Sequence, residues 1–168
     1  MALRNEPMLA RYSQWANETI YDVVAGLPEE AVTAPLETTF GSVLRTLGHG
    51  YAVGAIFQAH LEQRSHGFTV RNVPDSTTFG ALRAMQRDLD TRLVTWIDTV
   101  NALELDEPVR FRFLDGGEGT MTRREILFHV VNHYTFHRGF VVDTLRRMSA
   151  AVPATDLTVY LCERACQS

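Results

Sequence analysis

Apolar residues recur at intervals of three and four positions in four long segments of the chain, which is the spacing of an amphipathic α-helix. These segments cover about residues 7–27, 42–64, 76–100 and 122–148. Ser42 and Thr122 stand where N-caps are expected, and Glu125 follows Thr122 by three residues, as in a capping box. Four long helices in a chain of 168 residues predict an all-α fold, a four-helix bundle.

The period changes just before the last long helix. Residues 109–113 read Val-Arg-Phe-Arg-Phe, an alternation typical of a β-strand, and the glycine-rich stretch 115–119 predicts a turn into a return strand. We therefore expect a small β-hairpin here, and a short C-terminal helix from about 156 to 166. Because there is no internal repeat and no linker-like change of composition, residues 1–168 are expected to form a single domain.

Charge and composition narrow the classes of partner. Sixteen Lys and Arg against 20 Asp and Glu give a net charge of −4, without the basic excess of a nucleic-acid-binding surface. No apolar run approaches the ~18 residues of a membrane span and no signal peptide is recognisable, so we expect a cytoplasmic protein. The two cysteines, Cys162 and Cys166, are too few and too close for a disulfide framework and are interpreted as free surface thiols.

Three of the six histidines lie in the fourth helical segment, in the run His-Val-Val-Asn-His-Tyr-Thr-Phe-His. At about 100° per residue, His133 and His137 fall about 40° and 80° from His129 on the helical wheel. That arc also holds apolar residues that are expected to face the bundle interior, namely Ile126, Val130, Phe140 and Val141. Imidazoles that point inward need polar partners, and two histidines at i, i+4 suit a divalent metal ion.

A third ligand has to come from a facing helix, and His49 in the second segment is the candidate. His60 lies about 16 Å further along that helix, too far to reach the same ion, and His66 falls in a loop. His129, at the edge of the arc, is considered only as a pocket residue. The alternative is that His133 and His137 form an ordinary core or surface pair that binds no metal.

The run HVVNHYTFHRGFV, residues 129–141, resembles a signature of the DinB family, and the run 41–64 resembles its second helix with a histidine at position 49. The run ARYSQWAN more weakly resembles the first helix of the family, and DLTVYLCER its C-terminal segment, so the resemblance extends to nearly the whole chain. The resemblance implies a four-helix bundle, often a homodimer, that binds nickel or zinc through His49, His133 and His137. The chain departs from the family pattern at Gly54, where an acidic residue is common.

Characterised members of that family include thiol-dependent S-transferases, which implies a metal-dependent enzyme acting on a small electrophilic molecule with a low-molecular-weight thiol. A hydrolase that uses metal-bound water is the first alternative, and a non-catalytic metal-binding stress-response protein is the second. Hydrolysis usually needs a carboxylate base beside the metal, and no acidic residue lies between His133 and His137. This absence favours the thiol route.

Other residues near the histidines are interpreted as structural. Arg138 falls on the far side of the wheel from the histidines and is expected to serve helix packing or an interface. Gly139 is expected to allow a neighbouring helix to approach closely. Tyr51 and Tyr134 are possible proton donors, but aromatic residues on bundle helices are more often part of the core.

Overall fold

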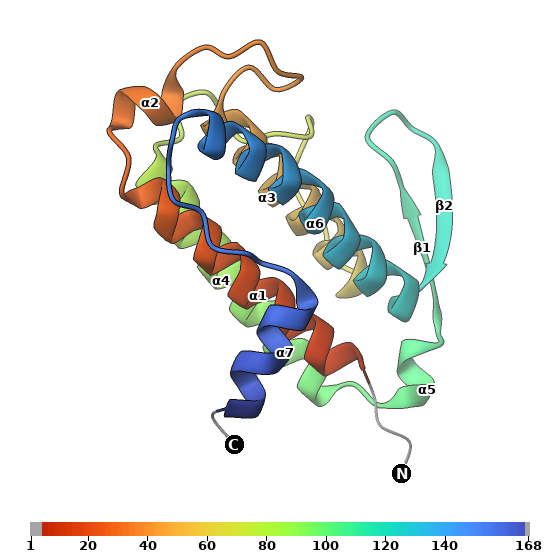
Figure 1. Ribbon diagram of the computed structural model, residues 1–168. Coiled ribbons are helices and arrows are strands. Elements are labelled where there is room, and N and C mark those ends of the chain that lie inside the picture. Colours follow the sequence, from red (N-terminus) through yellow and green to blue (C-terminus); the bar gives the residue numbers. More distant parts are fainter. Residues whose placement is uncertain (1–4, 167–168) are drawn as a thin grey trace.

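The computed structural model describes residues 5–166 and is built mainly from helices (Figure 1). The four long helices are α1 (Glu6–Ala25), α3 (Val43–Leu61), α4 (Phe79–Thr99) and α6 (Arg123–Arg147). The shorter elements are α2 (Glu29–Thr33), α5 (Ala102–Leu105), β1 (Pro108–Arg112), β2 (Glu118–Thr122) and α7 (Leu157–Cys166). The predicted all-α class, the hairpin before the last long helix and the short C-terminal helix are all confirmed. The helices α2 and α5 were not predicted, because four or five residues are too few to show a helical period.

The predicted caps fix the starts of the two helices that carry the histidines. The Ser42 hydroxyl accepts a hydrogen bond from the backbone N–H of Arg45, at 3.1 Å, and begins α3. Thr122 and Glu125 form the complete capping box at the start of α6. The third long helix begins slightly later than expected, with Thr78 as its N-cap. Residues 49, 133 and 137 therefore lie well inside regular helices, where their directions are fixed.

The long helices pack as a bundle in which α1 contacts α4 and α6, while α3 contacts the same two helices from the other side (Figure 1). The buried apolar side chains fall into two clusters. One cluster includes Val53, Phe57 and Ile126 toward the hairpin end, and the other includes Val43 and Leu145 toward the opposite end. Along their helices, His49 of α3 and His137 of α6 fall between the buried residues of the two clusters.

The hairpin lies beside the first half of α6 (Figure 1). Strands β1 and β2 are antiparallel, with Arg112 opposite Glu118 and Phe111 opposite Gly119. Val109 and Phe111 are buried, as the alternating sequence predicts. A Cβ at position 119 would lie 2.6 Å from the Phe111 ring, so a larger residue there would displace that ring. At the tip of the hairpin, Phe113 and Leu114 line a cavity together with residues of α3 and α6.

None of the described helices is long and apolar enough to cross a membrane. Both cysteines are exposed and unpaired on α7, as expected.

Candidate metal centre

Three histidines from two neighbouring helices converge on one point. His49 comes from α3, and His133 and His137 come from successive turns of α6. Their candidate ligand atoms all lie within 4.8 Å of one another, and within residues 5–166 this is the only group of this kind. His60, His66 and His129 are not part of it. The group could hold a metal ion, whereas its assignment as a ligand set stays a prediction.

The orientation of α6 differs from the predicted one. At about 100° per residue, its buried side chains spread from about 60° to 200° on the wheel that starts at His129, rather than from about 20° to 120°. Phe140 is therefore 48% exposed, and its predicted core position is wrong. Gly139 is also exposed, with no described atom of another element within 4 Å of a Cβ placed there, so its predicted close approach is wrong too. His137 lies inside the buried arc and His133 at its edge, where the site opens toward the cavity.

The hydrogen bonds around the three imidazoles leave nitrogen atoms without partners. His49 Nδ1 lies 2.6 Å from the backbone carbonyl of Arg71. A carbonyl only accepts, so Nδ1 carries the proton and Nε2 is left with a lone pair. His133 Nε2 and His137 Nδ1 are buried, with no hydrogen-bond partner in the described chain. Buried polar atoms without a partner are costly, and a metal ion would satisfy such atoms in this donor set.

Burial also keeps these imidazoles neutral. Desolvation, followed by the neighbouring histidines, lowers the pKa of His133 to about 3. Desolvation and the nearby His49 lower the pKa of His137 to about 4. A neutral imidazole is the form that binds a metal, so near pH 7 the metal-free site is already in its binding form.

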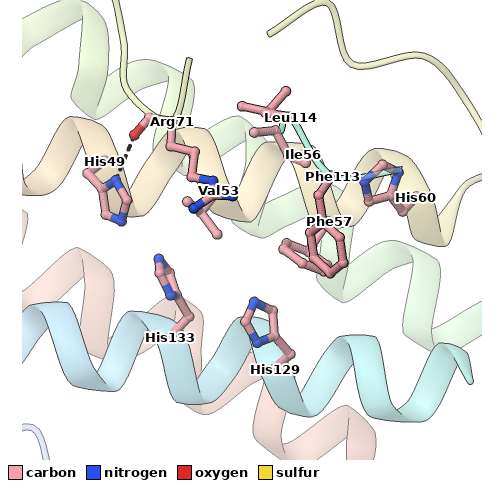
Figure 2. A pocket seen from close by; sticks show the side chains of 10 residues that line it. All are labelled: His49, Val53, Ile56, Phe57, His60, Arg71, Phe113, Leu114, His129 and His133. Carbon is pink, nitrogen blue, oxygen red and sulfur yellow. Dashed lines mark hydrogen bonds between the residues drawn. The ribbon is translucent and has the colours of Figure 1, made fainter. Parts of the chain in front are cut away.

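The surroundings of the site include residues that the sequence did not indicate. Phe40, from the loop before α3, stacks on His49 with ring centroids 4.5 Å apart and contacts His137 edge-on. On the other side a cavity of about 220 Å³ opens beside His49 and His133, and His60 and His129 also line it (Figure 2). From the sequence, His129 was considered as a pocket residue and His60 as a groove or surface residue. No local sequence pattern marks Phe40, because its role depends on contacts between the loop before α3 and the helices α3 and α6.

Gly54 is explained by the side chain that occupies the space above it. A Cβ at this position would lie 1.9 Å from the hydroxyl oxygen of Tyr134. Tyr134 is buried, and desolvation raises its pKa far above the ordinary value of 10. The tyrosine thus fills the room in which a side chain at position 54 would lie. It is a core residue, as the sequence favoured, and does not line the cavity beside His133.

A buried polar network lies behind the histidines. The Gln86 amide donates to the Tyr134 hydroxyl and to Asp90, and the Asn17 amide also donates to Asp90, at 3.1 Å. Arg138 donates to the side-chain oxygen of Asn17, at 2.9 Å. Arg138 is therefore a packing residue, one of the two roles considered for it. The network rigidifies α6 against α1 and α4 just behind the turn that carries His137.

Comparison with known proteins is consistent with this architecture. The sequence model of the DinB family matches residues 1–165. The chain is 27% identical over 159 residues to Protein DinB of Bacillus subtilis (strain 168), with 91% of each chain covered. Its fold is similar to a crystal structure of a DinB-like protein from Bacillus cereus ATCC 10987, with a TM-score of 0.65, 18% identity, and coverage of 83% of this chain and 90% of that one. A conserved protein from Enterococcus faecalis has a TM-score of 0.60 at 15% identity, over 86% of this chain and 97% of that one.

Proposed function

The chain belongs to the DinB family, and from that membership and the geometry of the site we propose that it is a metal-dependent enzyme, a thiol-dependent S-transferase acting on a small electrophilic molecule. His49, His133 and His137 would hold the divalent metal ion, nickel or zinc. The observation that carries the proposal is the convergence of three neutral imidazoles at the wall of a cavity. Three protein ligands are typical of a catalytic site, which keeps a position open, whereas structural sites are closed by four.

When bound, the metal supplies a Lewis acid that favours the thiolate form of a low-molecular-weight thiol. Residues of the chain orient the proposed ligands and exclude water from the site. The carbonyl of Arg71 orients the His49 ring and fixes its tautomer, an arrangement common around metal-binding histidines. Val53, Ile56 and Phe57 form an apolar wall that excludes water next to the site and strengthens electrostatic interactions there.

The composition of the cavity favours the transferase over the hydrolase. No carboxylate is among the described side chains that line it. Asp90, the acid of the buried network, accepts hydrogen bonds from Asn17 and Gln86 and does not line the cavity. A hydrolase would need a general base at hydrogen-bonding distance from the attacking water, and the cavity offers only histidines for that role.

The test is a paired assay on untagged protein, because an affinity tag brings its own histidines and metal. We expect about one zinc or nickel ion per chain by plasma mass spectrometry. We also expect transfer of a low-molecular-weight thiol to a small electrophile, measured by thiol consumption and lost on removal of the metal. Ester or amide hydrolysis without added thiol would support the hydrolase instead. Stoichiometric metal with neither activity would favour a binding protein, and a protein that takes up no metal would contradict the proposal.

We also propose that the protein is a homodimer. Its support is a pair of exposed aromatic residues on α6, Phe136 and Phe140, which contact each other with ring centroids 4.9 Å apart. Exposed aromatic residues of this kind are enriched at interfaces. Sedimentation velocity should show a dimer for the wild type and a monomer for Phe136→Glu. Leu103→Glu, which changes an exposed apolar residue on α5, should remain a dimer, and a monomeric wild type would contradict the proposal.

A further inference from the structure

The cavity beside the three histidines has two chemically different parts. Its floor and outer wall are apolar, formed by Val53, Ile56 and Phe57 of α3 and by Phe113 and Leu114 at the tip of the hairpin (Figure 2). Its volume of about 220 Å³ is enough for a small ring. Apolar walls of this kind bind the hydrocarbon part of a small molecule.

The other part of the cavity carries a positive charge. Arg71, in the loop between α3 and α4, is the one charged side chain among the described residues that line the cavity. Figure 2 shows its side chain reaching over α3 toward Val53, on the side next to His49. The remaining polar lining is histidine, namely His49, His60, His129 and His133. A negative charge in the cavity would therefore meet a cation, and the carboxylate that pairs with this cation, Asp115, is not among the residues that line the cavity.

The backbone of Arg71 is anchored, whereas its guanidinium forms only a weak ion pair. Its backbone carbonyl accepts the hydrogen bond from His49, so the residue is anchored next to the proposed metal ligand. Its guanidinium pairs with Asp115 on the hairpin at 3.6 Å, and the two side chains are 52% and 70% exposed. Such a long, exposed ion pair is weak. A guanidinium has five N–H donors in a planar fork that matches a carboxylate, so an incoming anion can compete with Asp115.

We propose that the substrate is a small molecule with an apolar body and a carboxylate, that Arg71 binds the carboxylate, and that the body lies against Phe57, Phe113 and Leu114. This inference rests on the proposed function, since it names the class of small molecule that the same site would take. Arg71 acts as a specificity-determining residue. A neutral molecule of the same shape loses the charged hydrogen bonds and keeps only the apolar contact.

The test measures binding of phenylacetate and of its neutral isostere phenylacetamide to the zinc-loaded protein by NMR titration. We expect the wild type to bind phenylacetate more tightly than phenylacetamide. Arg71→Gln should weaken phenylacetate binding about tenfold and leave phenylacetamide binding unchanged. Arg110→Gln is the matched control, because it removes the same charge from an exposed position on β1 outside the cavity.

Asp115→Asn separates a direct role of Arg71 from a structural one. Removing the competing carboxylate should strengthen phenylacetate binding severalfold, whereas a loop damaged by the mutation would weaken it. The inference is overturned if Arg71→Gln binds phenylacetate as tightly as the wild type, if it loses both probes equally, or if the wild type binds neither probe. Zinc content is measured separately for each protein. A wild type without zinc would count against the proposed function alone, and Arg71-independent binding by a zinc-loaded protein would count against this inference alone.

Discussion

Zinc at a free concentration a hundredfold above its Kd is expected to raise the Tm of the metal-free protein by about 5–10 °C. The reason is that the ion binds the folded state, where His49, His133 and His137 are brought together, and finds no such set in the unfolded chain. Two of the imidazoles also have buried nitrogen atoms without partners, which the ion would satisfy. The measurement is a thermal unfolding scan of chelator-treated, untagged protein with and without zinc.

His49→Ala and His133→Ala should each abolish most of this rise, because two histidines bind zinc far more weakly than three. His66→Ala is the matched control. His66 lies outside the three-histidine group, so this variant should respond to zinc as the wild type does. An equal rise in Tm in His133→Ala and in the wild type would show that zinc binds elsewhere, and would contradict the assignment of the ligands.

Much of the bundle could be predicted from the sequence because each long helix buries a stripe of side chains with the helical period. Ser42 and Thr122 mark helix starts through chemistry that is local to a few residues, and the hairpin follows from strict alternation around glycines. The rotation of α6 about its own axis, which decides which side chains face the core, was less well predicted. The wheel gives angles between side chains, but the neighbouring helices decide which angle faces the core, so Phe140 was placed in the core although it lies at the surface.

The site could be predicted only where spacing within one helix carries the information. His133 and His137 lie on one face because they are four residues apart. The other residues around the site depend on contacts between segments that are far apart in the chain. Phe40, Arg71 and the hairpin tip reach the histidines from three different connections, and nothing in their local sequence marks them.

The buried network did leave a signal in the sequence. Gln86 and Asp90 fall on the same helical stripe as the core residues Leu82, Leu89 and Leu93 of α4. Polar residues at positions where the period requires apolar ones indicate either a buried network or a site. Their partners, Asn17 of α1 and Tyr134 of α6, could not be identified without knowing which helices are neighbours.

The same network predicts an unusual pH dependence of stability. Burial raises the pKa of Asp90 from 3.8 to about 7, and the charge of Glu18 adds a little to this rise. The hydrogen bonds from Asn17 and Gln86 and the nearby charge of Arg138 act in the opposite direction and lower the pKa. Between pH 4 and pH 7 the folded protein therefore keeps a proton that the unfolded chain has lost. Stability from this group is fully present below the unfolded pKa and is lost as the pH rises through about 7. At 1.36 kcal/mol per pKa unit, the loss is at most about 4 kcal/mol.

Asp90→Asn removes this titrating group while keeping its size. The free energy of unfolding of the variant, minus that of the wild type, should therefore increase as the pH rises from 5 to 8. The measurement is urea unfolding at each pH, taken as the difference between the two proteins so that the contributions of the histidines cancel. Asp88→Asn, an exposed position on the same helix, should track the wild type at every pH. If the difference between Asp90→Asn and the wild type stays constant over this range, Asp90 is ionised in the folded protein throughout. The buried network would then be an ionic one, in which the charges of Asp90 and Arg138 balance each other through Asn17.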